Sequence, residues 1–276
     1  MKDEVDYISG ATRVFGIVGD PITQVRSPEL VTAEFVRRQL NAIMIPVHAP
    51  TVDFETVLRG LMKMSNLGGL IFTIPFKTDA IRFVDVVGPH AKIVGSINAM
   101  TKLPDGRWCG EIFDGVGCIV GIRKAGLSLT NKRLQLIGAG GAGSAIGVAM
   151  AFEHPAQIRI FDPDNNRANL LAAKIKKVDG EIETLIGPPT VDGIDFIFNA
   201  SPVGMLDDAR SPIGNYTIPS SVVVFDAIVM PERTPLLEAA ESFGCKTVRG
   251  REMMRGQIGR IVDFYENPGT FIDSGL

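Results

Sequence analysis

The chain has 276 residues, of which 45% are hydrophobic, 21% are charged and 30 are glycine. This composition is typical of a globular α/β protein, in which buried parallel strands are apolar along their whole length. Since domains typically hold about 50 to 200 residues, we expect two domains. The formal net charge of −3 gives no electrostatic reason to expect nucleic acid as a partner.

No segment of the sequence has the character of a membrane anchor. Residues 1–13 are polar and acidic and contain no apolar stretch of the kind found in signal peptides. Elsewhere no run reaches the roughly 18 apolar residues that a membrane-spanning helix requires. We therefore expect a cytoplasmic protein with no membrane partner.

The cysteines and histidines do not form a metal-binding pattern. The cysteines are odd in number and scattered, so we expect neither a disulfide framework nor a metal site. The histidines are isolated in sequence, and we expect them to be structural or surface residues rather than ligands or bases. The residues concerned are Cys109, Cys118, Cys245, His48, His90 and His154.

The first part of the chain alternates short apolar runs with helical patterns. These patterns predict strands over 13–19, 42–48 and 68–73, separated by helices over 27–40 and 52–64. Strands separated by helices of this length need crossover connections. We therefore expect an α/β fold with a mainly parallel sheet and right-handed connections.

A second α/β pattern starts at about Lys132, with the strand KRLQLIG, a glycine cluster, an alanine-rich helix to about Phe152 and the strand QIRIFD. Further strands are predicted over 181–186, 194–199, 222–227 and 245–248.

This restart indicates a domain boundary near residues 114–130. We expect one domain over 1–113 and a second over 114–249. A last helical pattern over 253–265 could fold back onto the first domain, so that about residues 250–276 complete it.

The strongest local signal is the glycine cluster at residues 138–143, which has the spacing G-x-G-x-x-G between an apolar strand and a helix. Its first glycine allows a tight turn, its second lets the backbone approach a pyrophosphate, and its third permits close helix packing. Without the strand and helix it would indicate only a turn. In this context it predicts dinucleotide binding by Gly138, Ala139, Gly140, Gly141, Ala142 and Gly143.

Asp162 ends the next predicted strand, roughly twenty residues past the glycine turn. An acidic side chain there can accept hydrogen bonds from the adenine ribose hydroxyls and would repel the additional phosphate of NADP. Because Pro163 rather than an arginine follows it, we expect NAD as the cofactor in preference to NADP. The alternative is that Asp162 caps the following helix, a role for which Asp164 is an equal candidate.

Four separated segments of the first 115 residues together form one pattern. They are GDPITQVRSP at 19–28, FTIPFK at 72–77, GSINA at 95–99 and FDG at 113–115. In order and spacing they resemble the motifs G-x-P-x-x-x-S-x-S-P, N-V-T-x-P-x-K, G-A-V-N-T and N-T-D-G of the shikimate dehydrogenase family. The resemblance covers nearly the whole chain. It implies a Rossmann oxidoreductase that moves a hydride between a nicotinamide and a secondary hydroxyl of shikimate or a related cyclic polyol.

The same resemblance implies roles for the two domains and for individual residues. Residues 1–113 would bind the substrate and residues 114–249 the dinucleotide. The implied substrate-binding positions are Val25, Ser27, Thr73, Asn98, Val229 and Gln257. The implied cofactor-binding positions in the run NASPVGM are Asn199, Ser201, Val203, Gly204 and Met205.

By resemblance, the hydroxyl to be oxidised lies between Lys77 and Asp114. Hydride transfer from a secondary alcohol leaves a proton that a neighbouring group must accept, and a lysine oriented by a carboxylate can relay it. Asn98 would bind the neighbouring hydroxyl. Read alone, Lys77 would be a surface residue and Asp114 a helix cap, so the assignment rests on the combined pattern.

The sequence departs from the family pattern where the substrate carboxylate would be held. A serine of the first motif is replaced by Val25 and a tyrosine by Val229, while Ile71 and the pair Ile112 and Phe113 replace polar residues. Apolar side chains in place of hydrogen-bond donors should weaken carboxylate binding. The family's NADP signature N-R-T-x-x-R is also absent, because residues 162–167 read DPDNNR.

Several interpretations remain open at this point. The chain could oxidise shikimate, quinate or a ring alcohol that lacks the carboxylate, or it could be a non-catalytic dinucleotide-binding sensor. Arg26 could also take over the carboxylate, although it is more typical of a solvated surface charge. We expect a small cyclic hydroxy acid or polyol as partner, and a monomer or homodimer.

Overall fold

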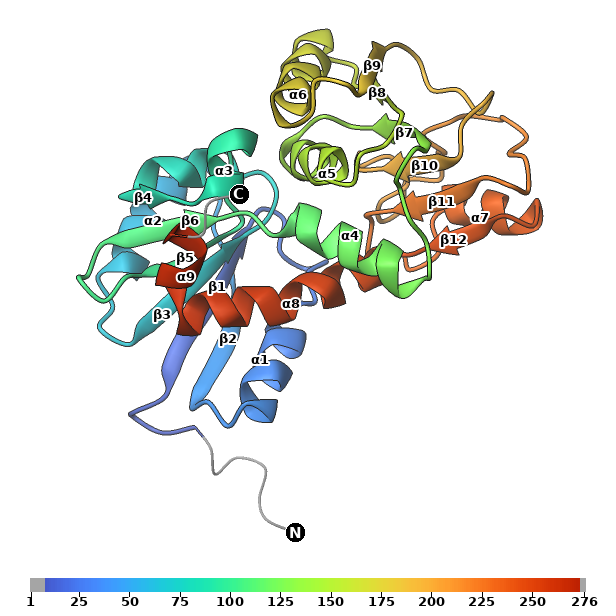
Figure 1. The fold of residues 1–276 in the computed structure, drawn as a ribbon. Coiled ribbons are helices and arrows are strands. Elements are labelled where there is room, and N and C mark those ends of the chain that lie inside the picture. Colours follow the sequence, from blue (N-terminus) through green and yellow to red (C-terminus); the bar gives the residue numbers. More distant parts are fainter. Residues whose placement is uncertain (1–7, 274–276) are drawn as a thin grey trace. The chain divides into compact units, whose positions relative to one another are not determined.

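The computed structural model describes residues 8–273, so the polar N-terminal segment lies partly outside the described residues. The chain divides into two compact units, one of Met1–Phe113 with Ile258–Leu276 and the other of Asp114–Gln257. Each unit is built around its own sheet (Figure 1). The α/β class with two mainly parallel sheets, predicted from the sequence, is confirmed.

The sheet of the first unit is mixed, with the strand order β2-β1-β3-β5-β6-β4. β5 runs antiparallel to both of its neighbours, and the other pairs are parallel. The strands are β1 (Arg13–Gly19), β2 (Ala42–His48), β3 (Leu67–Phe72), β4 (Val86–Val87), β5 (Ala99–Lys102) and β6 (Trp108–Glu111). β3, with the sequence LGGLIF, is buried along its whole length, as a central strand should be.

Aromatic side chains pack on the sheet of this unit. Phe15 on β1 lies 4.7 Å from the ring of Phe35 and 4.7 Å from the ring of Tyr265, which joins three segments far apart in sequence. The helical elements of the unit are α1 (Ser27–Arg37), η1 (Thr51–Asp53), α2 (Phe54–Met62), η2 (Asp79–Phe83), α3 (Pro89–Val94) and α9 (Pro268–Asp273). The end of α8 (Gly250–Glu266) also belongs to it.

Two predicted helices differ from the structure in extent. α1 ends at Arg37 rather than residue 40, because Gln39 takes a left-handed backbone conformation with φ of 59°. The helix predicted over 52–64 is instead the short η1 followed by α2. The sequence patterns did not identify β4, β5 and β6, which are only two to four residues long.

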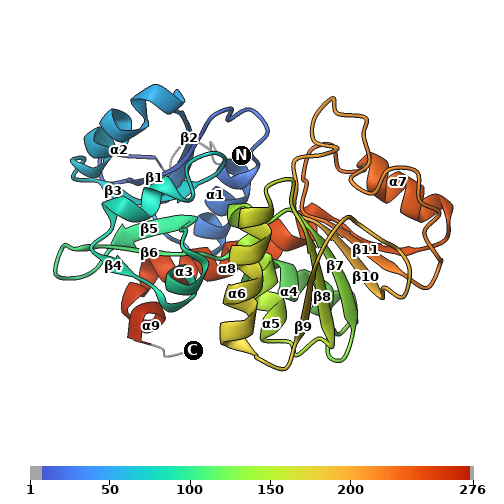
Figure 2. The same ribbon diagram turned by 90° about the horizontal axis from the view of Figure 1, so that it is seen from above.

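The second unit contains a parallel sheet with the order β12-β11-β10-β7-β8-β9. Its strands are β7 (Arg133–Ile137), β8 (Gln157–Phe161), β9 (Glu183–Ile186), β10 (Phe196–Asn199), β11 (Val223–Asp226) and β12 (Lys246–Val248). Figure 2 shows α4 (Asp114–Lys124), α5 (Gly141–Ala151) and α6 (Asn165–Val178) on one face of this sheet and α7 (Pro235–Ser242) on the other. Both faces are therefore covered, which parallel sheets require.

The strand order reverses between β7 and β10. From β7 the chain proceeds through β8 to β9, and it then returns to the other side of β7 to build β10, β11 and β12. In open α/β sheets, ligands bind at the carboxyl ends of the strands where the order reverses. The loops that follow β7 and β10 are therefore the expected ligand-binding loops of this unit.

Candidate active site

In the first unit, the family-like motifs meet at one edge of the sheet. The first motif follows β1 and the segment with Lys77 follows β3, and these two strands are parallel. Asn98 precedes β5, which runs the opposite way, so it lies at the same edge. Phe113 follows β6, which is antiparallel to β5 and thus also ends there.

Backbone hydrogen bonds tie these segments together. The N–H of Asp20 donates to the carbonyl of Ile74 at 3.0 Å, and the N–H of Thr73 donates to that of Val18 at 3.0 Å. The N–H of Ile97 donates to the carbonyl of Lys77, also at 3.0 Å. Thr73 and Lys77 therefore belong to one hydrogen-bonded assembly with the first motif and with the segment that carries Asn98.

Lys77 is held at its backbone by an aromatic anchor. The preceding residue, Phe76, is buried and stacks on Phe54 of α2, with ring centroids 4.0 Å apart and planes 5° from parallel. Phe54 in turn meets Phe72 and Phe83 edge to face. The Lys77 side chain is half-buried rather than fully exposed. The stacking of Phe76 thus fixes the backbone beside Lys77, and the catalytic role of Lys77 stays a prediction.

The amide of Asn98 has a defined orientation. Asn98 is only 2% exposed, and its Oδ1 accepts a hydrogen bond of 2.9 Å from the backbone N–H of Phe113. Because Oδ1 accepts this hydrogen bond, the other end of the amide, Nδ2, is a hydrogen-bond donor.

The first motif begins α1, and its charged residue is already paired. Arg26 donates to Glu29 through Nε at 2.8 Å and also through a second guanidinium nitrogen, across the first turn of the helix. Ser27 is the first residue of α1, and both Ser27 and Val25 are half-buried. A substrate carboxylate would have to compete with Glu29 for Arg26, which weighs against Arg26 as the residue that holds it.

In the second unit, the glycine turn has the geometry of a dinucleotide-binding loop. Gly138 has φ of 98°, a conformation that L side chains rarely adopt, and α5 begins three residues later at Gly141. A Cβ on Gly143 would lie 2.0 Å from the carbonyl oxygen of Gly138, so this position excludes a side chain. A Cβ on Gly140 would meet no atom within 4 Å, which leaves open space beside the helix start.

Asp162 does not cap the following helix. That role belongs to Asp164, whose Oδ1 accepts from the N–H of Asn166 at 2.9 Å in the first turn of α6. Asp162 Oδ2 instead accepts from the N–H of Ala139 at 2.7 Å, and its Oδ1 accepts from the N–H of Asp164 at 2.9 Å. Asp162 is therefore hydrogen-bonded to the glycine loop, and its role toward the adenine ribose stays a prediction.

A compact turn follows β10 and contains the second group of predicted cofactor residues. Asn199 Oδ1 accepts from both the N–H and the hydroxyl of Ser201, and Asn199 Nδ2 donates to the carbonyl of Val203. Gly204 has φ of 94°, which suits glycine. Met205 closes the turn by donating its N–H to Pro202 at 3.1 Å. The turn is thus fixed by Asn199 at the switch point of the sheet.

Asp226, at the end of β11, accepts a hydrogen bond from Asn199 and so holds this turn in place. Its Oδ1 accepts from Asn199 Nδ2 at 3.1 Å and from the N–H of Ile228 at 3.0 Å, and its Oδ2 lies 2.7 Å from the Thr234 hydroxyl. The residue is fully buried, and this burial raises the pKa of its carboxyl from 3.8 to about 6. Val229, three residues further, is half-buried.

The remaining predicted residues lie on α4 and α8. Asp114 is the first residue of α4 and is 3% exposed, so it is not a simple solvated cap. It directly follows Phe113, whose N–H is bound by Asn98. Gln257 is half-buried and is the last residue that α8 contributes to the second unit.

Sequence reasoning did not identify Glu111, which organises the end of β6. This carboxylate is 1% exposed and accepts from the N–H groups of Ala91 and Ile112, both at 2.7 Å, and of His90 at 3.3 Å. Its backbone carbonyl also accepts from the N–H of Asn98 at 3.0 Å. The one sequence signal for this role is a charged residue in the short, otherwise uncharged strand WCGE.

The histidines and cysteines lie apart from the candidate binding residues in sequence. The histidines pair with acidic residues, namely His48 with Asp20, His90 with Glu111 and His154 with Asp179. The three cysteines are buried and free. Over residues 8–273, no three His, Cys, Asp or Glu side chains gather into a group that could hold a metal ion, and no helix has the length and apolar character to span a membrane.

In the second unit, a glycine turn opens a helix at the switch point of the parallel sheet, and in the first unit polar residues cluster at one edge of the sheet. This combination is typical of a two-unit oxidoreductase of the Rossmann class. Comparison with known proteins narrows this class. The family model for the shikimate dehydrogenase substrate binding domain matches residues 17–100.

The relatives extend this match over the whole chain. A shikimate dehydrogenase (NADP(+)) of Alkaliphilus oremlandii is 32% identical over 275 residues, covering 96% of each chain. A solved shikimate dehydrogenase in complex with NADP+ has a TM-score of 0.85 at 25% identity, covering 94% of this chain and 91% of the other. A shikimate 5-dehydrogenase from Listeria monocytogenes, solved with shikimate and NAD, shares the fold with a TM-score of 0.83 at 24% identity, covering 97% and 95%. The chain belongs to the shikimate dehydrogenase family.

Proposed function

We propose that this protein is a nicotinamide-dependent dehydrogenase that oxidises a secondary hydroxyl of a shikimate-like ring, with NAD preferred over NADP. The proposal rests on the hydrogen bonds at one edge of the first unit's sheet, which link the Lys77 segment to the first motif and to the segment that carries Asn98. The substrate would be bound by this unit, and the dinucleotide by the glycine loop and the Asn199 turn.

A nicotinamide dinucleotide held by the glycine loop and the Asn199 turn would supply the hydride acceptor for the oxidation. The residues of this chain account for the remaining steps. Lys77 takes the proton of the hydroxyl as the carbon loses its hydride, so that the products are the ketone, the reduced nicotinamide and one proton. Asp114 orients the lysine, and Asn98 Nδ2 donates to the neighbouring hydroxyl and fixes the ring. Thr73, Ser27 and Gln257 complete the substrate-binding set.

The preference for NAD is supported by the position of Asp162. Its carboxylate is bound to the N–H of Ala139 in the glycine loop, and Pro163 follows it. A negative charge at the loop disfavours the 2′-phosphate of NADP, and no arginine stands at position 163 to bind that phosphate. The relatives named above include proteins whose names or structures specify NADP+ and one that was solved with NAD, so this preference is a specific property that we propose for this chain.

This chain lacks two of the hydrogen-bond donors that would bind a substrate carboxylate in the family pattern. Val25 and Val229 stand where the family pattern has hydroxyl groups, and Arg26 is paired with Glu29. We therefore propose that the preferred substrate is a ring polyol whose substituent at this position is less polar than a carboxylate, and that shikimate is a poor substrate.

The proposal is tested by following the absorbance of reduced nicotinamide with a panel of substrates, separately with NAD and NADP. The panel contains shikimate, quinate, and cyclic polyols of the same hydroxyl configuration that lack the carboxylate. Turnover of one member with a higher kcat/KM for NAD supports the proposal. Dinucleotide binding without turnover of any member would instead favour the sensor interpretation.

A further inference from the structure

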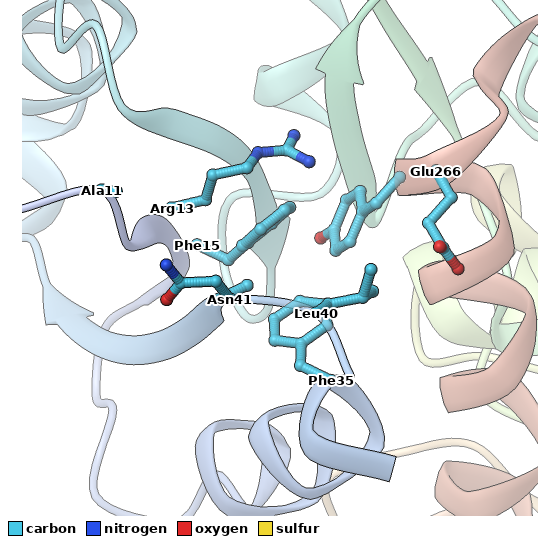
Figure 3. Close-up of a pocket in the computed structure, with 9 residues that line it drawn as sticks. Ala11, Arg13, Phe15, Phe35, Leu40, Asn41 and Glu266 are labelled. Carbon is cyan, nitrogen blue, oxygen red and sulfur yellow. The ribbon is translucent and has the colours of Figure 1, made fainter. Parts of the chain in front are cut away.

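A cavity of about 180 Å³ lies within the first unit (Figure 3). Its lining includes Arg13 and Ala42, the first residues of β1 and β2, whereas the residues of the candidate active site follow the last residue of β1. Because each strand residue advances by about 3.3 Å, the seven residues of β1 separate the two places by roughly 20 Å. This cavity is therefore distinct from the candidate active site and does not depend on the proposed function.

The body of the cavity is aromatic. Phe15 lies in contact with Phe35 of α1 and with Tyr265 of α8, each at a centroid distance of 4.7 Å, and Leu40 completes the apolar wall. An apolar cavity of about 150 Å³ is large enough to bind benzene. The space therefore fits one six-membered aromatic ring with a small substituent.

One residue of the cavity lining, Tyr265, carries a buried hydroxyl. Tyr265 is 4% exposed, and within the described part of the chain its Oη has no hydrogen-bond partner. Burial raises the pKa of this phenol well above its usual value, so the group stays neutral and remains a donor. The Tyr265 ring packs directly on Gly69, since a Cβ on Gly69 would lie 2.8 Å from a carbon of that ring. The ring therefore has no room to move toward the sheet. Buried hydroxyls are normally hydrogen-bonded, so Tyr265 indicates a missing acceptor.

A positive charge stands at the rim of the cavity. The guanidinium of Arg13 lies 5.1 Å above the Phe15 ring, and Arg13 has no ion pair with any residue in 8–273. The carboxylate at the same rim, Glu266, is already paired with Arg38 at 2.7 Å. Among residues 8–273 Arg13 thus has no carboxylate partner, and a guanidinium binds carboxylates well through its parallel N–H donors.

We propose that this cavity is a binding site for a small aromatic carboxylate. The ring of the ligand packs against Phe15 and Phe35, its carboxylate pairs with Arg13, and the hydroxyl of Tyr265 donates to a ligand oxygen. Aromatic walls, one cation and one unpaired donor match this class better than a sugar, which would leave its hydroxyls facing Phe15, Phe35 and Leu40.

The test is a titration of the full chain with 4-fluorobenzoate, followed by ¹⁹F NMR. For a ligand of this size we expect a dissociation constant on the order of 1 mM. Arg13→Gln should weaken binding roughly 10-fold or more, and Tyr265→Phe roughly 10-fold, since each removes one hydrogen-bonding group. The neutral 4-fluorobenzamide should bind more weakly than the acid to the unmodified chain and should not respond to Arg13→Gln.

Matched controls separate this site from general effects. Lys102→Gln removes another cation that lies over an aromatic ring, 5.0 Å above Trp108, and Tyr216→Phe removes an exposed phenol hydroxyl. Both should leave binding of 4-fluorobenzoate unchanged. If Tyr265→Phe fails to fold, as judged by thermal unfolding, Arg13→Gln still decides the matter, because Arg13 is exposed.

The candidate active site could also attract a carboxylate, so one further variant distinguishes the two places. Ser27→Ala should not change binding of 4-fluorobenzoate if the cavity at Tyr265 is the site. Loss of binding in Ser27→Ala, with Arg13→Gln and Tyr265→Phe unaffected, would overturn the proposal. The absence of any binding at 10 mM ligand, about ten times the expected dissociation constant, would do the same.

Discussion

The carboxylate of Asp162 accepts a hydrogen bond of 2.7 Å from the backbone N–H of Ala139, inside the glycine loop. The charge that we expect to select NAD therefore also holds the loop in shape. This double role determines how cofactor preference has to be tested, because a substitution that removes the hydrogen bond would disturb the loop itself.

Cofactor preference should change when charge at the loop is altered and the hydrogen bond is kept. Asp162→Asn retains an oxygen acceptor for the Ala139 N–H and removes the negative charge, and Pro163→Arg adds a partner for a 2′-phosphate. The double variant should shift the ratio of kcat/KM for NAD and NADP by at least about tenfold toward NADP. Steady-state kinetics with both cofactors measure this ratio. An unmodified enzyme that already prefers NADP would refute the assignment of Asp162.

Replacing two glycines of the loop by alanine should affect different properties: stability in one case and dinucleotide affinity in the other. Gly143→Ala places a Cβ 2.0 Å from the Gly138 carbonyl, so we expect a loss of roughly 1 to 3 kcal/mol in the free energy of unfolding. Gly140→Ala meets no atom within 4 Å and should keep its stability, yet weaken dinucleotide binding by about tenfold or more, because the pyrophosphate approaches there. Thermal unfolding and a dinucleotide titration compare the two. Equal behaviour of both variants would contradict this division of roles.

Lys77 is assigned to proton transfer, so its removal should affect turnover rather than folding. Lys77→Ala should lower kcat by roughly 10²- to 10⁴-fold while dinucleotide affinity stays nearly constant. Lys92→Ala, which removes an exposed lysine of α3, is the matched control and should leave kcat unchanged. Full activity of Lys77→Ala on the true substrate would show that another group takes the proton.

The valines of the first motif and of the segment after β11 should limit the use of shikimate. Val25→Ser together with Val229→Tyr restores two hydrogen-bond donors, each worth roughly 1.5 to 3 kcal/mol to a charged group. Shikimate should then bind up to two to four orders of magnitude better, mainly through a lower KM, because the carboxylate is held alike in the ground and transition states. No gain in the double variant would mean that a different residue, such as Arg26 released from Glu29, holds the carboxylate.

The buried Asp226 makes stability depend on pH in a defined direction. Its pKa is raised from 3.8 to about 6, so its contribution is fully present below pH 3.8 and is lost as the pH rises through about 6. Asp226→Asn retains the acceptor for Asn199 and Ile228 but cannot ionise. Relative to the unmodified chain, this variant should gain up to about 3 kcal/mol between pH 4 and pH 7.

Urea unfolding at several pH values measures this difference. Asp207→Asn, which removes an exposed carboxylate nearby in the second unit, should show no comparable trend. A constant difference between Asp226→Asn and the unmodified chain across this pH range would mean that folding does not raise the pKa of Asp226.

Some of this architecture could be predicted from the sequence because the signals are local. The strands at 13–19 and 42–48 have the predicted bounds, since each is an apolar run between turns. β5 and β6 were missed because each spans four residues, too few to show a period. Asp162 and Asp164 could not be separated, since both precede the helix, and only their hydrogen bonds distinguish them.

The cavity beside Tyr265 could not have been predicted at all. It depends on the contact of Phe15 with Tyr265, which lie 250 positions apart in a chain without internal repeats. The roles of Lys77, Asp114 and the other residues assigned by resemblance stay predictions until the experiments above are carried out.

The position of Arg38 has a consequence for the order in which the chain folds during synthesis. Arg38 pairs with Asp263 and Glu266, each at 2.7 Å, and donates to the carbonyl of Gly259 at 3.1 Å. These partners are translated after the whole of Asp114–Gln257. On the ribosome, the first unit therefore lacks the end of α8, including Phe264 and Tyr265, until synthesis is nearly finished. Part of its aromatic core stays exposed until then. The second unit is continuous in sequence, so it can complete its own sheet earlier.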